Sequence, residues 1–237
     1  MIPILIVISA CLAGSCYGQG SSGALAFSGS SYLSIGNSVS VRPSTALTLE
    51  AWVYVTNHLG TDRRMLISKD DDWNPATSGY HMWIEGGSGT PVFGVGNNVV
   101  NGTYVAGADP FPLNGWHHLA GTFVAGTLQL YLDGVLIASS NSAPATIGYS
   151  TDELRIGRLS AAFSTYNYFF DGRIDEIRIW NRALTEAEIR HKMTERLTGT
   201  EPGLAAYWRM DEGTDNTCPG GQDVCDASGN GNHGTKF

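Results

Sequence analysis

The stretch "WHHLAGTFVAGTLQLYLDGVLIAS", residues 116–139, decides the fold class of this chain. Apolar and polar residues alternate along much of it, and this alternation is the period of a half-buried β-strand. Asp133 and Gly134 stand between two such runs, and an Asp-Gly pair in this setting favours a tight two-residue hairpin turn. The stretch therefore predicts antiparallel strands joined by tight turns.

Further strand-like segments occur on both sides of this stretch. They are found at residues 47–55, 64–69, 80–85, 91–96, 152–157 and 172–180. The chain has 237 residues, 30 of them glycine, and only 15% are charged, a composition that favours strands and turns over helices. Many short strands joined by glycine-rich turns are typical of an all-β, two-sheet antiparallel sandwich or jelly roll. A chain of this length can bury a sizeable core.

One helix is predicted near the C-terminal end, in "LTEAEIRHKMTERLTG", residues 184–199. Thr185 is its expected N-cap, and Glu188 three positions later completes a capping box. Gly199 is a natural stop for the helix. An apolar stripe at four-residue spacing predicts that this short helix packs on the surface of the sandwich; the stripe consists of Ile189, Met193 and Leu197.

The first residues, "MIPILIVISACLAGSCYGQG", form an apolar run followed by small residues. The run is too short to span a bilayer as a helix, and it predicts a signal peptide over residues 1–18. Residues 19–237 would then form one secreted domain, with no membrane insertion after cleavage. Two alternatives stay open: "ISAC", residues 8–11, resembles a bacterial lipobox, and the run could be a buried N-terminal strand.

The net charge indicates which kinds of partner the protein can bind, and the cysteines indicate the cellular compartment. The formal net charge of −8 argues against nucleic acid and anionic membranes as main partners. Cys218 and Cys225 flank "PGGQDV", where a turn makes a local disulfide geometrically easy. A disulfide is the expected state in a secreted chain. Free thiols or a metal pair are the alternatives, and zinc is disfavoured because no further well-spaced ligands stand nearby.

Four segments together resemble the laminin-G-like, concanavalin A-like jelly-roll domain of secreted and cell-surface proteins. They are "LTLEAWVYV" at residues 47–55, the stretch at 116–139, "LRIGR" at 154–158, and "FDGRIDEIRIWNRALTEAEIR" at 170–190. The resemblance covers about residues 24–190 and keeps the order of the segments. It implies two antiparallel sheets packed face to face, and a secreted module that binds extracellular glycan, protein or calcium. It does not imply one ligand, because one fold hosts many functions.

The C-terminal residues 199–237 resemble a displaced part of the same domain. "GLAAYWRMDEGT" and "DASGNGNHGT", at residues 203–214 and 226–235, are similar to the segment that opens a domain of this family. Here the piece expected to follow it stands at residues 23–36. The displaced strand could close its own sandwich, be donated to a neighbouring molecule in a self-associating structural subunit, or begin a second domain. We favour self-closure, because exposed sheet edges must be covered.

The resemblance also implies a structural calcium. Asp175 opens "DEIRIW", where related jelly rolls often carry an aspartate that helps to hold calcium beside the terminal strands. The expected partners are Asp211 or Glu212, together with Asp226 and Asn230, whose oxygens suit a hard cation although their spacing is not that of an EF-hand. In the alternative interpretation, Asp175 accepts backbone N–H groups and residues 226–232 form a tight turn.

Catalysis is not expected. The chain has no Glu-x-Asp-x-Glu strand, no Gly-x-Ser-x-Gly elbow and no His-Glu-x-x-His helix. Alternation also predicts that adjacent Asp175 and Glu176 point to opposite faces of their strand. Aromatic residues in or near two long turns are candidate platforms for a glycan, namely Trp73, Tyr80 and Tyr166.

Overall fold

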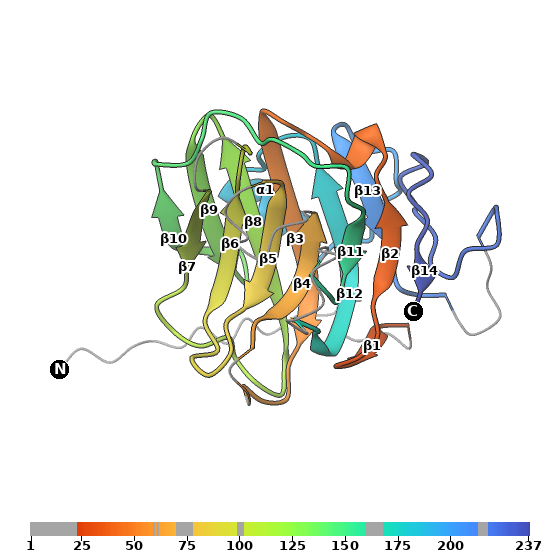
Figure 1. The fold of residues 1–237 in the computed structure, drawn as a ribbon, viewed down its shortest axis with the longest axis horizontal. Helices are drawn as coiled ribbons and strands as arrows, with labels where there is room; N and C mark the ends of the chain where they lie inside the picture. The colour runs from red at the N-terminus through yellow and green to blue at the C-terminus, as the bar shows by residue number, and fades with distance from the viewer. Residues whose placement is uncertain are drawn as a thin grey trace.

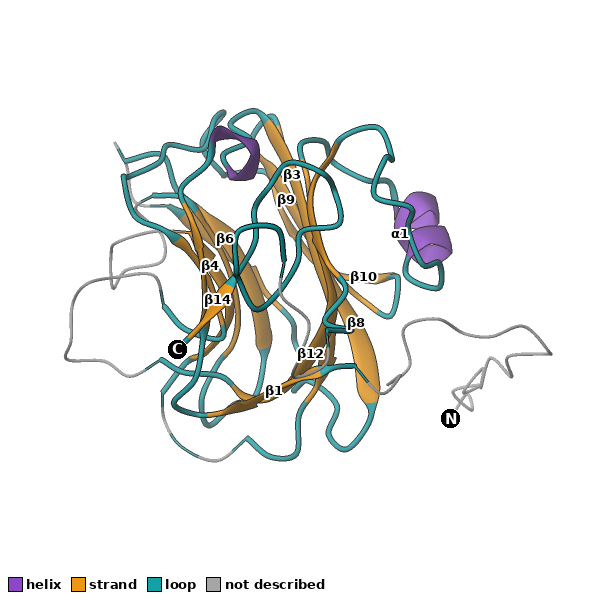
Figure 2. Ribbon diagram, turned by 90° about the vertical axis from the view of Figure 1, so that its right-hand side faces the viewer, coloured by secondary structure: helices purple, strands orange, loops and turns teal. Residues whose placement is uncertain are grey.

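The computed structural model describes residues 23–58, 60, 62–69, 78–98, 102–159, 168–212 and 218–237. These residues form two antiparallel seven-stranded sheets packed face to face, which confirms the predicted sandwich (Figures 1 and 2). Sheet I has the order β1 (Leu25–Ser28), β12 (Asp171–Trp180), β3 (Ala46–Tyr54), β8 (Trp116–Val124), β9 (Thr127–Leu132) and β10 (Val135–Ser140), with β13 (Leu204–Trp208) also paired to β12. Sheet II has the order β14 (Thr235–Lys236), β2 (Leu33–Gly36), β11 (Leu154–Ile156), β4 (Arg64–Lys69), β5 (Tyr80–Ile84), β6 (Pro91–Val95) and β7 (Thr103–Ala106).

The hairpin predicted at Asp133 and Gly134 joins β9 to β10. Both residues have positive φ, 51° and 74°, as a type I′ turn requires. The aspartate also ties the turn to the neighbouring strand β8: its Oδ1 accepts the backbone N–H of His118 at 2.8 Å, and its Oδ2 lies 2.7 Å from Nδ1 of His117. This short sequence motif therefore fixes the register of three adjacent strands.

The main core lies between the two sheets and consists of aliphatic and aromatic side chains from both. Close packing across the layers depends on Gly121 in β8, where a Cβ would overlap the ring of Phe93 from β6. A glycine in mid-strand costs conformational entropy, and here it lets the opposing ring approach the backbone. A short 3₁₀ turn at Val39–Val41 links β2 to β3 and buries Val41 in the same core.

The helix α1 (Glu186–Lys192) covers the outer face of sheet I, as Figure 2 shows. Thr185 is its N-cap and the capping box with Glu188 is present, as predicted. Ile189 and Leu197 are buried against this face together with aromatic side chains of the sheet. The outer face of sheet I thus has a second, smaller core of its own.

The prediction that the helix reaches Gly199 was wrong, because α1 ends at Lys192. The buried guanidinium of Arg178 in β12 donates to the carbonyl oxygens of Lys192 and Glu195, each at 2.7 Å. Trp52 Nε1 donates to the carbonyl oxygen of Met193 at 2.9 Å. Side chains of the sheet thus satisfy the carbonyls at the end of the helix, so the chain can leave the helical path without losing those hydrogen bonds.

Arg178 is the centre of a buried ionic network. It forms ion pairs with Glu176 at 2.7 Å and Glu50 at 3.4 Å, and all three side chains are almost completely buried. Trp180 Nε1 also donates to Glu50 Oε1, at 2.9 Å. His118 lies 3.5 Å from Glu50, but burial lowers the pKa of His118 to about 4, so its imidazole is neutral at physiological pH. Two buried carboxylates therefore share one arginine as their cationic partner.

Two segments from opposite ends of the chain share one edge of β12. The first half of β12 pairs with β1, in the register Leu25–Ile174 to Ser28–Asp171. The second half pairs with β13, in the register Ile177–Trp208 to Trp180–Leu204. The strand β13 thus completes a sheet of its own chain, and the final strand β14 pairs with β2 in the other sheet.

This pairing predicts that the protein is a monomer in solution. With β13 on its own β12, the edge that a donated strand would cover is already occupied. Light scattering coupled to size exclusion should give one mass, corresponding to a single chain, across a hundredfold range of concentration. Oligomers that grow with concentration would instead favour strand donation between molecules.

Replacing Arg178 should destabilise the fold strongly. In Arg178→Ala, the carboxylates of Glu50 and Glu176 stay buried without their cation, a change that typically costs about 3–5 kcal/mol. For a domain of this size we expect the melting temperature to fall by roughly 10 °C. The control is Arg182→Ala, because Arg182 and its partner Glu188 are about one third exposed and such a pair contributes little. Equal melting temperatures for the two variants would contradict the importance of the buried network.

Candidate functional site

The candidate site lies where the two end segments meet along β12. The register between β12 and β3 shifts between Asp175 and Arg178, which marks a bulge. Ile174 and Ile177 both point into the core, so strict alternation fails over the two residues between them. The simple alternation on which the expectation for Asp175 and Glu176 rested therefore does not hold at this place. Glu176 has a φ of 51°, a conformation that non-glycine residues rarely adopt.

The segment before β1 touches the segment after β13 at this bulge. A Cβ at Gly23 would lie 2.6 Å from Cα of Asp211, 2.7 Å from its Oδ1 and 3.0 Å from the carbonyl oxygen of Met210. Only glycine allows an approach this close. Met210 itself has a φ of 54°. Sequence reasoning found Asp211 but missed Gly23 and Met210, because no local pattern indicates which backbone atoms two distant segments bring together.

Three carboxylates gather around the bulge. Asp175 is only 2% exposed, and its Oδ1 accepts the backbone N–H of Glu176 at 2.9 Å. Burial first, and then the negative charges of Glu176 and Asp211, raise the pKa of Asp175 to about 7, although its hydrogen bond and Arg178 act in the opposite direction. The structure thus brings together Asp175 and Asp211, two of the four predicted cation ligands.

The other two predicted ligands, Asp226 and Asn230, serve the turn instead. Oδ1 of Asp226 accepts the N–H groups of Tyr207 and Ser228, and its Oδ2 accepts both the backbone and the side-chain N–H of Asn232, at 2.9–3.0 Å. Asn230 Nδ2 donates to the carbonyl oxygen of Ala205 at 3.0 Å. With its oxygens already occupied, Asp226 fastens the turn at residues 226–232 to β13, as the alternative interpretation expected.

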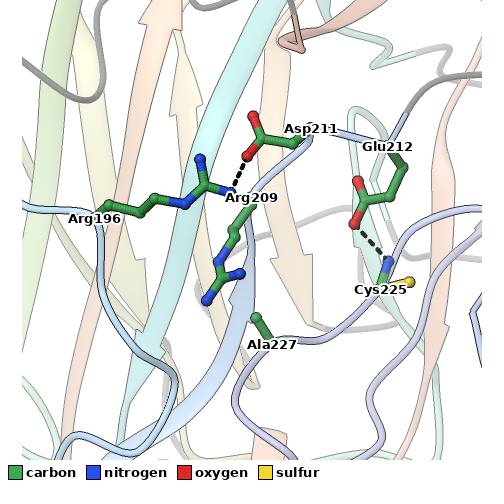
Figure 3. Close-up of a pocket in the computed structure, with 6 residues that line it drawn as sticks. All are labelled: Arg196, Arg209, Asp211, Glu212, Cys225 and Ala227. Carbon is green, nitrogen blue, oxygen red and sulfur yellow. Dashed lines mark hydrogen bonds and ion pairs between the residues drawn. The ribbon is translucent and has the colours of Figure 1, made fainter.

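A small polar pocket adjoins the same segment, with a volume of about 220 Å³ (Figure 3). Asp211 contributes an oxygen to an ion pair with Arg196 on one side of it. On the other side, Glu212 Oε1 accepts the N–H of Cys225 at 3.0 Å. The pocket is lined by Arg196, Arg209, Asp211, Glu212, Cys225 and Ala227.

The predicted disulfide is present between Cys218 and Cys225. His233 lies close enough for these three side chains to resemble a metal-binding group. The cysteines are joined to each other, so their sulfurs are not available as thiolate ligands. The disulfide therefore has a structural role, because it closes the loop between residues 218 and 225.

Of the three predicted glycan contacts, the structure describes only Tyr80. Trp73 and Tyr166 lie outside the described residues. Tyr80 is fully buried: its ring belongs to the core between the sheets, and its hydroxyl donates to the carbonyl oxygen of Val41 at 2.9 Å. The proposed ligand contact of Tyr80 is therefore corrected, because β5 begins at this residue and alternation turns Tyr80, Met82 and Ile84 inward.

No helix among the described residues is long and apolar enough to cross a membrane.

Comparison with known proteins identifies relatives of this sandwich. A mouse protein, pentraxin-related protein PTX3, is 29% identical in a match of 167 residues that covers 64% of this chain and 41% of that protein. A solved structure from Bacteroides ovatus, of a protein whose proposed role is carbohydrate binding, superposes with a TM-score of 0.71 at 24% identity, over 90% of this chain and 57% of that one. The chain thus spans less than two thirds of the length of each.

A third relative is a carbohydrate-binding module. The CBM40 of the Ruminococcus gnavus IT-sialidase, solved with α2,3-sialyllactose, has a TM-score of 0.54 at 14% identity, over 73% of this chain and 97% of the module. At such identities the structures show a shared fold. The family match is more specific: the laminin G model described as "Concanavalin A-like lectin/glucanases superfamily" covers residues 27–190, more than half of the sequence. The chain therefore belongs to the laminin G type of the concanavalin A-like lectin/glucanases superfamily.

Proposed function

We propose that this protein is a secreted, non-enzymatic module that binds extracellular glycan or protein. The observation that carries the proposal is the laminin-G-type sandwich, which the family match covers over residues 27–190. Solved structures of carbohydrate-binding modules share this fold, among them the CBM40 described above. Fold alone does not determine function, so the proposal depends on the binding experiment below.

The buried acidic residues support a binding role over catalysis. Hydrolysis of glycosides uses a pair of carboxylates that flank a substrate in a cleft. Glu50 and Glu176 instead pair with the same guanidinium inside the protein, where Arg178 is 1% exposed. Their position beneath α1 suits a structural role.

An extracellular location is part of the proposal. The disulfide between Cys218 and Cys225 is of the kind that persists in oxidising compartments. A signal peptide over residues 1–18 stays a prediction on residues outside the described part of the chain.

Trp73 and Tyr166 remain the proposed glycan contacts. Loops carry binding residues more often than the strands that support them, and flat aromatic faces stack on the apolar faces of sugars.

Binding to a glycan array tests this function. The mature protein should retain at least one glycan, and Trp73→Ala should lower the signal for it about tenfold or more, because a ring–sugar contact is lost. Trp73→Phe is the matched control, since it keeps an aromatic face and should retain part of the binding. If an array that spans neutral and acidic glycans gives no signal, the glycan proposal fails and a protein partner becomes the object of search.

We also propose that one calcium ion stabilises the junction at the β12 bulge. Calcium takes six to eight oxygen ligands from carboxylates, carbonyls and water. Asp175 and Asp211 are suitable ligands, and the carbonyl oxygen of Met210 lies at the same contact with Gly23. A buried carboxyl whose pKa is raised by two neighbouring carboxylates fits a cation, because a positive charge would relieve that repulsion. Calcium would cross-link β12 to the segment that follows β13.

Calcium should raise the melting temperature, and more so at pH 8 than at pH 5. The folded-state pKa of Asp175 is about 7, which is above its ordinary value. Folding therefore favours the neutral carboxyl, and this contribution to the free energy of unfolding is fully present at a pH below the ordinary value. This stability is lost as the pH rises through 7, and calcium offsets the loss. At a hundred times its dissociation constant calcium adds about 2.7 kcal/mol, or roughly 5–10 °C.

Differential scanning calorimetry with calcium and with EDTA measures this effect. Asp175→Asn and Asp211→Asn should each abolish the calcium-dependent rise in melting temperature. Asp223→Asn is the control and should retain this rise, because the Oδ2 of Asp223 accepts the N–H of Lys236 in β14. An unchanged melting temperature after EDTA treatment at pH 8 would rule out a structural calcium.

A further inference from the structure

A cluster of arginine and aromatic side chains lies at one end of sheet II, away from the β12 bulge. Here β14, β2 and β11 are consecutive neighbours in the sheet (Figure 1). We call this cluster the arginine–aromatic patch; it consists of Tyr32, Arg155, Arg158, Phe169 and Phe237. Neither the calcium proposal nor the proposed glycan contacts Trp73 and Tyr166 use any of these residues.

Tyr32 is the centre of the patch. Phe237 stacks on its ring with a centroid separation of 5.1 Å and an interplanar angle of 13°, and Phe169 lies 6.3 Å away on a tilted ring. The stack is fixed by the backbone: Tyr32 N–H donates to the carbonyl of Phe237 at 3.1 Å, and Phe237 N–H donates to the carbonyl of Tyr32 at 2.9 Å. The rings are therefore held in place by strand pairing, while Phe237 remains 63% exposed.

Two guanidinium groups lie against the same tyrosine. The Arg155 guanidinium is 5.3 Å and that of Arg158 is 5.1 Å from the ring centroid of Tyr32. Arg158 is also 4.9 Å from the ring of Phe169. At these distances the cations are attracted to the ring faces. Stacking on a ring occupies the flat face of a guanidinium and leaves its N–H edge available for an acceptor.

Neither guanidinium has an acceptor within the described part of the chain. Arg63, Arg178, Arg182, Arg190 and Arg196 each form an ion pair there, whereas Arg155 and Arg158 form neither an ion pair nor a hydrogen bond through their side chains. Nε of Arg155 is even buried without a partner. The neighbouring carboxylate of Glu153 is engaged by the hydroxyl of Ser34. Two like charges are thus held together without a counter-ion in a protein whose net charge is −8.

A ligand that completes this patch must combine an anion with an apolar face. A carboxylate or sulfate group would accept hydrogen bonds from the guanidinium edges, which match such groups in geometry. The carbon face of a sugar ring could stack on the exposed side of Phe237. Nucleic acid is disfavoured, because its binding relies on many phosphate contacts and the patch offers only two arginines in a protein whose net charge is −8.

We propose that the arginine–aromatic patch binds an acidic glycan, one that carries carboxylate or sulfate groups. This inference rests on the proposed glycan-binding function and specifies its ligand class and a second contact surface. Arg155 and Arg158 hold the anionic groups, and Tyr32, Phe169 and Phe237 fix the arginines and present the apolar face.

Titration of the mature protein with a sulfated polysaccharide, a polyuronate and a neutral polysaccharide tests the inference by calorimetry. At least one acidic polymer should bind at 0.15 M salt, and more weakly as salt rises. Arg155→Ala and Arg158→Ala should each lower its affinity about tenfold, and Arg158→Lys, which keeps the charge but loses the planar fork, should fall between wild type and Arg158→Ala.

Arg173→Ala is the matched control. Arg173 is exposed, lies 5.6 Å from the ring of Tyr54 on sheet I and forms no ion pair within the described residues, so the variant loses the same charge at another place. It should bind acidic glycan within twofold of wild type. Melting temperatures within a few degrees of wild type exclude misfolding of each variant.

The outcomes separate this inference from the function on which it rests. If neutral glycans bind and acidic ones bind no better, the patch inference is overturned while the glycan-binding function stands. Equal losses of affinity for acidic glycan in Arg155→Ala and Arg173→Ala would also overturn it, because the effect would then come from the net charge of the protein and not from the patch. Absence of binding to every glycan on the array and in the titrations would overturn both.

Discussion

The structure depends on the pairing of one strand, β12. Its inner edge pairs with β3 in the middle of sheet I, and its outer edge is covered by β1 and β13 from opposite ends of the chain. Neither end segment is long enough to cover that edge alone, and an uncovered edge exposes unpaired N–H and C=O groups. Strands from the two ends of the described chain therefore close the sandwich together along β12.

The bulge in β12 lies at the place where the strand changes partner from β1 to β13. Where β1 ends its pairing and β13 begins, the strand inserts an extra residue, and Glu176 adopts a positive φ. A bulge can re-aim side chains, and here it leaves Asp175 buried beside two other carboxylates. The same strand carries Arg178, which forms ion pairs with Glu176 and Glu50 and also donates to a carbonyl at the end of α1. Closure of the fold, burial of charge and the candidate cation site are thus consequences of one strand.

The candidate sites differ in how they are built. The bulge is held by backbone contacts as close as that between Gly23 and Asp211, so its carboxylates are preorganised. The arginine–aromatic patch is held by the pairing of β14 with β2, which places Phe237 on Tyr32. Both sites involve the displaced C-terminal segment, which therefore contributes more than coverage of an edge.

The sequence by itself determined those features that depend only on residues a few positions apart. The Asp133-Gly134 turn, the capping box of Thr185 and Glu188, and the Cys218–Cys225 disulfide all formed as predicted. Each depends on backbone conformation or proximity within a short segment, and so do the alternating patterns that indicated the sandwich. The family resemblance over residues 24–190 also followed from the order of such segments.

Tertiary structure alone decided where α1 ends and that Tyr80 is buried. It also decided that Asp175 and Asp211 come together at the bulge, whereas Asp226 and Asn230 serve a turn. The helix ends at Lys192 because Arg178 reaches its carbonyls from the sheet, which no helical pattern could indicate. Asp226 is occupied by backbone N–H groups that approach only when the turn packs on β13. These outcomes depend on which segments become neighbours across the two sheets, and a one-dimensional pattern of side chains does not contain that information.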